Sequence, residues 1–164
     1  MELEIRDIPE HIAYTAEYDV ESYDDFFDPA TGENRLQDLE DFMHENNPDV
    51  IVPEIPHDYN YFTHPAGVVP SGRMHVRYFD MVDRFGKDDP EGSYRFVAVP
   101  AVRAAVIPWE GPNPTVPEGI ARAFALVKEA GMQPAGDTRV SAIHGPWDRE
   151  DEKEYLVEIQ IPVK

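Results

Sequence analysis

The stretch Ile5-Arg6-Asp7-Ile8-Pro9 has a counterpart in Phe96-Val97-Ala98-Val99-Pro100 later in the chain. Each stretch is a short apolar run that ends at a proline. A second β-rich run follows it, at residues 12–16 in the first case and 103–107 in the second. Because proline cannot donate a hydrogen bond to a neighbouring strand, it fits a bend between two strand segments. The sequence therefore contains an internal repeat, and each copy begins with a pair of strands.

A helix is predicted after the strands of the second copy. Thr115-Val116-Pro117-Glu118 has the form of a capping box, and Gly131 stands where a left-handed residue commonly ends a helix. The apolar positions expected to face the sheet follow helical spacing and are Ile120, Ala121, Phe124, Ala125 and Val127.

The first copy has a matching helix, and both copies end in extended chain. The apolar stripe of the first helix is Leu36, Leu39, Phe42 and Met43. Extended segments are expected at residues 58–62 and 74–82, and again at residues 139–143 and 155–163. The order strand, strand, helix, strand, strand is thus predicted twice, over residues 3–82 and 94–163, with residues 83–92 as the linker.

This order predicts a single α+β domain that spans residues 1–164. We expect a tandem pseudo-twofold repeat of β-β-α-β-β units, with antiparallel sheets and the helices on one face. A unit of about 80 residues buries little surface alone, so the two units should associate side by side. That association leaves a central groove between the halves, where aromatic side chains from both sides could hold a ligand.

The chain is strongly acidic. It has 164 residues, with 33 Asp and Glu against 14 Lys and Arg, which gives a formal net charge of −19. This balance argues against direct nucleic-acid binding, which needs a basic face, and against binding to anionic membranes. Residues 1–90 hold 22 acidic and 6 basic residues (net −16), whereas residues 91–164 hold 11 and 8 (net −3). An acidic surface of this kind suits a salt-rich cytoplasm or a basic protein partner.

Several classes of site are excluded by the sequence. There is no cysteine, which rules out disulfides, thiolate metal sites and cysteine nucleophiles. The six histidines have no ligand spacing and no phosphate-binding glycine loop is present, so we expect neither a metal nor a cofactor. The N-terminus lacks the basic-then-apolar order of a signal peptide, and the longest apolar stretch is broken by Arg103. We therefore expect a cytoplasmic protein.

The last strand holds a candidate binding residue, Glu158. Alternate side chains of residues 156–161 are apolar and should pack on the helices, whereas Glu158 points to the opposite face. On a solvated face this carboxylate would be ordinary, but in a groove it needs a cationic or hydrogen-bonding partner. Arg77 occupies the corresponding place in the first repeat, so an internal Arg77–Glu158 ion pair is an alternative to ligand binding.

Aromatic side chains are the second indication of a site. They lie on the predicted strands or beside them, and aromatic rings near a carboxylate suit a flat apolar or cationic ligand. The plainer explanation is that most of them belong to the core of a small β-rich domain. Repeat geometry makes Tyr14 and Tyr61 candidates, while Trp109 and Trp147 each neighbour a loop rich in glycine and proline.

The second half of the chain resembles the GyrI-like small-molecule-binding domain. The resemblance rests on the order of Val99-Pro100-Ala101, Trp109-Glu110-Gly111-Pro112, an amphipathic helix, Gly131-Met132-Gln133-Pro134 and Glu158-Ile159-Gln160-Ile161-Pro162-Val163. It is good over residues 93–163 and weak over residues 1–92. This domain is also the effector-binding half of AraC- and MerR-type multidrug-responsive transcription activators.

The resemblance implies a function and a set of site residues. In drug-binding members, a buried glutamate in an aromatic groove receives cationic lipophilic compounds, and Glu158 matches that glutamate. Trp109 and Tyr155 are carried over as groove aromatics. The sequence departs from the family pattern in an acidic insertion at residues 20–35 and a proline-rich turn, Gly111-Pro112-Asn113-Pro114.

Three functions follow as hypotheses. The leading one is a freestanding protein that binds small apolar or cationic ligands, since the repeat begins almost at residue 1 and leaves no room for a DNA-binding helix-turn-helix. The second is a small hydrolase of reactive genotoxic compounds with Glu158 as general base, as in some family members. The third is an acidic protein-interaction module of gyrase-inhibitor type. A binding protein is favoured over an enzyme.

Overall fold

The computed structural model describes residues 3–23, 25, 32–54 and 59–164, so parts of the acidic insertion lie outside it. Within these residues the predicted order of strands and helices occurs twice. The first half holds β1 (Glu4–Ile8), β2 (His11–Val20), α2 (Gly32–Asn46), β3 (Asn60–His64) and β4 (Met74–Val82). The second half holds β5 (Tyr94–Val99), β6 (Val102–Glu110), α3 (Val116–Glu129), β7 (Thr138–His144) and β8 (Leu156–Pro162), with short 3-10 turns at Asn113–Thr115 and Glu152–Glu154.

The eight described strands form one open antiparallel sheet in the order β1-β6-β8-β7-β3-β4-β2-β5. The order is unchanged when the strands of one half are exchanged for their counterparts in the other. The halves meet at β3 and β7, while β1 pairs with β6 and β5 pairs with β2. Each half therefore supplies the edge strand of the other, and the α+β fold class is confirmed.

The helices cover one face of the sheet, which we call the outer face. The strand residues beneath α3 are apolar: Ala105, Ile107, Val157, Ile159 and Ile161. Beneath α2, Leu39 and Met43 pack with Tyr14, Val82 and Phe96. The alternation predicted for residues 156–161 is thus confirmed, because the apolar side chains of β8 pack in the core beneath α3.

The buried face of α3 differs in detail from the prediction. Ile120 and Val127 are buried as expected, and Ala123 is buried with them, but Ala121 and Ala125 are exposed and Phe124 is only half-buried. A helix that packs over a sheet buries a narrow stripe, and small residues allow its backbone to approach closely.

The N-terminus of α3 also lacks the predicted capping box. Thr115 has helical backbone angles and makes no side-chain cap, since a 3-10 turn precedes the helix. Its hydroxyl donates instead to the Pro112 carbonyl and accepts from the Trp109 indole. The C-terminus is as predicted, with Gly131 in the left-handed region at φ 75°.

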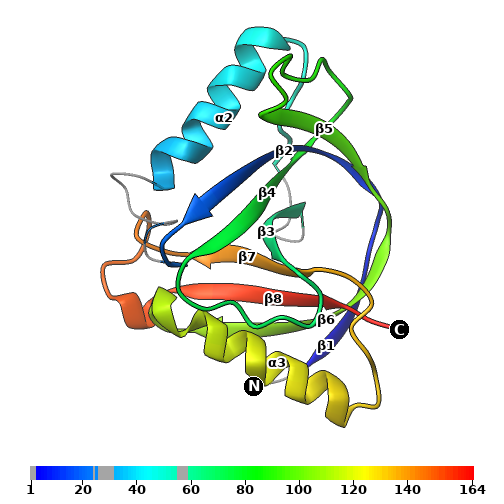
Figure 1. Ribbon diagram of the computed structural model, residues 1–164, viewed down its shortest axis with the longest axis vertical. Coiled ribbons are helices and arrows are strands. Elements are labelled where there is room, and N and C mark those ends of the chain that lie inside the picture. Colours follow the sequence, from blue (N-terminus) through cyan, green and yellow to red (C-terminus); the bar gives the residue numbers. More distant parts are fainter. Residues whose placement is uncertain (1–2, 24, 26–31, 55–58) are drawn as a thin grey trace.

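The opposite, inner face is also buried, although neither described helix covers it. Tyr61, Ala13, Ala104 and Val106 point to this face and are at most 1% exposed. Figure 1 shows the reason, because the sheet curls strongly and α2 and α3 lie outside the curl. The inner face is therefore shielded by the sheet itself.

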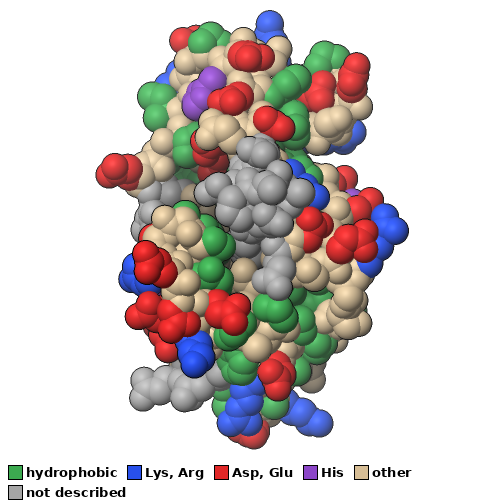
Figure 2. All heavy atoms as spheres, turned by 90° about the vertical axis from the view of Figure 1, so that its left-hand side faces the viewer, with side chains coloured by type: hydrophobic (Ala, Val, Ile, Leu, Met, Phe, Trp, Pro, Cys, Tyr) green, Lys and Arg blue, Asp and Glu red, His purple; other side chains and the backbone are tan. Residues whose placement is uncertain are grey.

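Figure 2 shows acidic side chains in several groups over one side of the molecule, with fewer basic ones among them. In the described part of the chain, neither helix is both long and apolar enough to span a membrane.

Candidate functional site

Glu158 lies on the inner face, where it forms an ion pair with Arg6. The two guanidinium nitrogens Nη1 and Nη2 donate to the two carboxylate oxygens at 3.3 and 3.2 Å. The Arg6 side chain is 27% exposed and that of Glu158 is 17% exposed, so the pair is largely shielded. Arg6 also contacts the exposed Glu4 at 3.0 Å. The expected groove carboxylate is therefore already paired with a cation of the protein.

The exchange of edge strands brings this pair together. Arg6 belongs to the first half in sequence, but β1 pairs with β6, and β6 pairs with β8. Arg6 is therefore two strands away from Glu158 and also offset along the sheet, since Ala104, the β6 residue opposite Arg6, pairs with Pro162 rather than with Glu158.

Arg77 does not pair with Glu158. If the repeats are aligned at the central pair Phe62 and Val140, Arg77 falls at the position of Glu158, as the sequence predicted. Its Nη2 instead donates to the Thr15 hydroxyl at 3.1 Å. The internal ion pair considered from the sequence exists, but with a different arginine.

Two aromatic rings stack between two arginines on the inner face. Tyr61 on β3 and Phe79 on β4 are directly paired in register, and their ring centroids lie 4.9 Å apart at an interplanar angle of 21°. The Arg139 guanidinium lies 4.7 Å from the centroid of Tyr61, and that of Arg77 lies 5.2 Å from the centroid of Phe79. These four residues, together with His11, are called the inner-face cluster.

His11 closes the cluster through a hydrogen bond. Its Nδ1 lies 3.1 Å from the Pro9 carbonyl, to which it must donate, so Nε2 is left to accept from the Tyr61 hydroxyl at 3.4 Å. Burial lowers the pKa of His11, and the nearby Arg139 lowers it further. Burial raises the pKa of Tyr61 to about 12, against the opposing effect of Arg139 and Arg77. At neutral pH the cluster therefore holds a neutral imidazole and phenol beside two guanidinium cations.

The remaining predicted site residues lie elsewhere. Trp109 is on the outer face, where its ring packs against Gly119 of α3 and its Nε1 donates to Thr115 at 3.0 Å. Tyr14 is buried in the core beneath α2, and its ring centroid lies 4.6 Å from that of Phe96. Tyr155 is half-buried just before β8, and its carbonyl accepts from the Gly111 amide at 2.8 Å. The structure thus brings Glu158, Tyr61 and Arg77 to one face but does not bring Trp109 or Tyr14 there.

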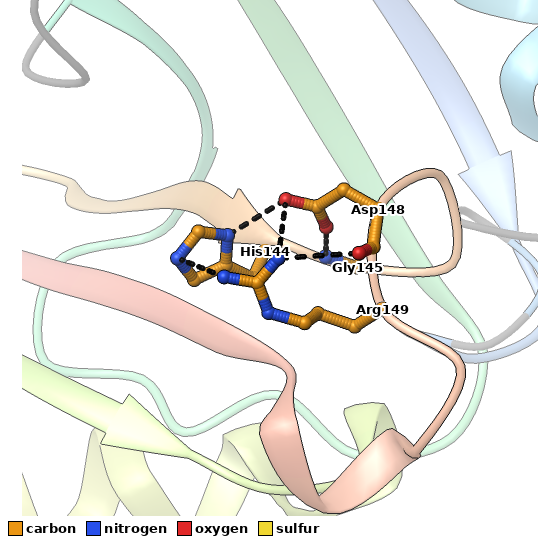
Figure 3. Close-up of polar contacts among 4 residues, drawn as sticks. All are labelled: His144, Gly145, Asp148 and Arg149. Atoms are coloured by element: carbon orange, nitrogen blue, oxygen red, sulfur yellow. Dashed lines mark hydrogen bonds and ion pairs between the residues drawn. The ribbon is translucent and has the colours of Figure 1, made fainter.

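The loop after β7 forms a closed polar network (Figure 3). Asp148 accepts from the Gly145 amide at 3.0 Å and from His144 Nδ1 at 2.7 Å, while Arg149 donates to His144 Nε2 at 3.2 Å. The Gly145 and His144 hydrogen bonds lower the pKa of Asp148. Because both imidazole nitrogens of His144 are engaged, the His144–Asp148 pair fixes the turn. Trp147 in the same loop is 50% exposed.

Two cavities adjoin the inner-face cluster. One, of about 270 Å³, is lined by Thr15, Arg77 and Arg95 near the start of β5. The other, of about 560 Å³, is lined by His11 and Met81 at the other end of the same strands. In the described ranges, no group of three or more His, Asp and Glu side chains is placed to hold a metal ion.

The site residues predicted from the sequence did not include Arg6, Arg139, Phe79 and His11. Side chains alternate between the two faces of a strand, so the sequence of residues 138–144 places Arg139 on the face away from that of Val140. The same reasoning was applied to Glu158. The same alternation places Phe79 on the same face of its strand as Arg77. Nothing local in the sequence points to Arg6, because its partner depends on the exchange of edge strands.

Comparison with known proteins agrees with this architecture. The family model of the GyrI-like small molecule binding domain matches residues 9–164. The chain therefore belongs to the GyrI-like small-molecule-binding family. No curated protein matches the sequence.

Solved structures share the fold at low sequence identity. The EcmrR C-terminal domain has a TM-score of 0.79 and 22% identity, with 99% of this chain and 97% of that one covered. In an EcmrR–DNA complex the match has a TM-score of 0.76 and 23% identity, and covers 99% of this chain but 57% of the EcmrR chain. SAV2435 bound to tetraphenylphosphonium (TM-score 0.54, 12% identity, 100% and 94% covered) and a hydrolase from Listeria innocua (0.64, 10%, 99% and 91%) are also similar.

Proposed function

We propose that this protein binds a small, flat molecule on the inner face of its sheet, against the inner-face cluster. The observation that carries the proposal is the stacked pair Tyr61–Phe79, which lies at the centre of the curled sheet with a guanidinium at each end. Each ring has one face on the other ring and its second face on a guanidinium, so a planar ligand would reach the stack at the half-buried Phe79 and Arg77, which offer apolar contact and a defined orientation. Membership of a small-molecule-binding family supports the same role.

The sequence predicted a small apolar or cationic ligand, and the present proposal keeps the apolar ligand. A cationic ligand would have to compete with Arg6 for Glu158, since both carboxylate oxygens accept hydrogen bonds from Arg6. Arg6→Gln leaves that carboxylate without its cation. An aromatic cation should therefore bind this variant more tightly than the wild type.

The other two hypotheses stay predictions. A hydrolase with Glu158 as general base requires that carboxylate to leave Arg6 before it accepts a proton from water. An interaction module that binds a basic protein would use the acidic outer surface rather than the inner face. Neither gains support from the inner-face cluster.

The proposal is tested by ligand binding to ring-deletion variants. The probe is naphthalene-2-carboxamide, a neutral planar molecule, and binding is followed by NMR chemical shifts and calorimetry. Phe79→Leu and Tyr61→Leu should weaken binding about five-fold or more, since each removes one ring of the stacked pair. Phe85→Leu is the control, because Phe85 is 55% exposed and outside the cluster. Shift changes confined to the outer face, or equal losses in all three variants, would contradict the proposal.

A further inference from the structure

The 270 Å³ cavity beside the inner-face cluster lies at a threonine that stands between two longer side chains. Thr15 of β2 pairs in register with Phe79 of β4 on one side and with Arg95 of β5 on the other. The short threonine side chain leaves a hollow between them, and Arg77, Arg95 and Ser93 line it. A space of this size lies just below the usual range for small-molecule pockets, so it suits a compact ligand.

Arg77 is held at this cavity by uncharged groups. Its Nη2 donates to the Thr15 hydroxyl at 3.1 Å, and its guanidinium carbon lies 5.2 Å from the centroid of the Phe79 ring. The Thr15 hydroxyl donates in turn to the Arg95 carbonyl at 3.2 Å, which leaves its oxygen to accept from Arg77. The guanidinium is therefore oriented while its charge is not balanced, and its other N–H groups have no hydrogen-bond partner among the described residues.

Arg95 reaches the same cavity from the edge strand β5. Its Nη2 lies against Gly92, where a Cβ atom would be only 3.2 Å away, and Gly92 has a left-handed φ of 79°. The missing side chain at Gly92 thus makes room for the guanidinium at the cavity wall. Among the residues that the structure describes, neither Arg95 nor Arg77 forms an ion pair with a carboxylate.

The carboxylate at this cavity, Glu17, is engaged by another group. Although Glu17 pairs in register with Arg77, its Oε1 lies 3.2 Å from His75 Nε2. The Glu17 side chain is also exposed, so water and salt screen its charge. Two guanidinium groups therefore share a small cavity with one solvated carboxylate, in a chain of formal net charge −19. An anion between two like charges relieves their mutual repulsion.

We infer that this cavity binds a compact oxyanion, a phosphate-like or sulfate-like group, between the guanidinium groups of Arg77 and Arg95. The planar fork of a guanidinium matches the oxygen atoms of such a group, and the hydrogen bonds that form are charge-assisted. The inference goes beyond the proposed function, because the two arginines attract an anion whether or not a ring packs beside Phe79. The oxyanion is either a free ion or the acidic group of a planar ligand that also contacts Phe79.

Titration with inorganic sulfate at pH 6.5 tests the inference, since sulfate is a dianion at this pH. Calorimetry and the arginine Nε–H NMR signals follow binding at a constant ionic strength set with sodium chloride. Arg95→Gln should weaken sulfate binding about five-fold or more, because one charge-assisted contact is lost. Arg95 is exposed, so this variant should fold as the wild type does.

Two further variants fix the place of binding and the sign of its charge. Glu17→Gln removes the carboxylate that lines the cavity, so it should strengthen sulfate binding about two-fold or more. Arg122→Gln removes a positive charge from an exposed position of α3 and should leave sulfate binding unchanged.

Methyl sulfate and phenyl sulfate distinguish the two sources of the oxyanion, because they carry the same charge. If the group belongs to a planar ligand, phenyl sulfate should bind about five-fold more tightly than methyl sulfate, and Phe79→Leu should remove the difference. Equal affinities would identify the cavity as a site for a free ion.

The outcomes separate this inference from the proposed function. Sulfate binding that is weakened in Arg95→Gln and strengthened in Glu17→Gln supports the oxyanion site. No binding of sulfate, or equal affinity in Arg95→Gln and the wild type, overturns it and leaves the proposed function in place, because the neutral naphthalene-2-carboxamide needs no anion site. Binding of sulfate without binding of the amide overturns the proposed function alone.

Discussion

Asp80 is a carboxyl group in the outer-face core, between β4 and α2. It is 3% exposed, and burial together with the neighbouring Glu40 raises its pKa to about 8 from an ordinary value of 3.8. The folded protein therefore keeps a proton on this group at pH values where the unfolded chain has lost it. Stability from this source is complete below about pH 4 and is lost as the pH rises through about 8.

Replacement of Asp80 should remove this pH dependence. Asp80→Asn resembles the protonated acid, so its stability relative to the wild type should increase by roughly 1–3 kcal/mol between pH 6.5 and pH 8.5. Chemical denaturation at several pH values between 6.5 and 8.5 measures this. The window begins at 6.5 because the buried His64, whose pKa is lowered to about 4, has the opposite effect below that pH.

The exposed Asp137 provides the control for this experiment. Asp137→Asn should leave the pH profile as in the wild type. A parallel pH profile for Asp80→Asn and wild type would show that Asp80 is ionised in the folded protein.

At the scale of elements, α3 is held to the sheet by a close contact at Gly119. A Cβ atom at this position would lie 2.6 Å from Cδ2 and 2.7 Å from Cγ of Trp109. The ring cannot turn away freely, because its Nε1 donates to the Thr115 hydroxyl. The glycine thus allows the helix to approach the sheet.

Gly119→Ala should destabilise the protein although alanine is the better helix former. Helix propensity alone predicts a gain of about 1 kcal/mol, whereas the clash with Trp109 should give a net loss of about 1–3 kcal/mol. Thermal denaturation gives the sign directly. The double variant with Trp109→Leu should recover part of the loss; a stabilised single variant would mean that α3 packs less closely than described.

The elements themselves were largely predictable from the sequence. Period-two alternation in residues 156–161 and the stripe of Leu39 and Met43 reflect burial on one face, which local sequence records. The stripe of α3 was less accurate, because Ala123 and Ala125 are alike in hydrophobicity and only their tertiary contacts distinguish them. The predicted capping box at Thr115 was wrong for a similar reason, since the Thr115 hydroxyl accepts from the Trp109 indole and donates to the Pro112 carbonyl instead of capping the helix.

At the scale of the molecule, the exchange of β1 and β5 joins the two halves more firmly than a linker could. Residues 83–92 are mostly exposed, although Asn47 exchanges hydrogen bonds with the backbone of Lys87 at 2.6 and 3.1 Å. The main connection is the sheet, in which each half supplies an edge strand to the other.

A cut in the linker should therefore leave the molecule intact. With a specific protease site inserted after Arg84, the two fragments should co-elute in size-exclusion chromatography and separate only in denaturant. Their unfolding midpoint should be lower than that of the uncut protein, because the linker no longer raises the effective concentration of the halves. Separation without denaturant would contradict the exchanged-strand arrangement.

The same exchange explains why the site was only partly predictable. Glu158, Tyr61 and Arg77 could be placed by strand parity, which is local. The pairing of Glu158 with Arg6 depends on strands far apart in the sequence, and the resemblance to relatives with a groove glutamate favoured a cationic ligand. The position of Trp109 was misleading, because a loop-adjacent tryptophan has the same local sequence whether it faces a ligand or a helix.

The central claim is that a small molecule binds against the inner-face cluster. Intermolecular NOEs between bound naphthalene-2-carboxamide and the protein test it most directly. We expect contacts from the naphthalene ring to Tyr61 and Phe79, and none to Trp109 on the outer face. Contacts to Trp109 and α3, with none to Tyr61 or Phe79, would contradict it.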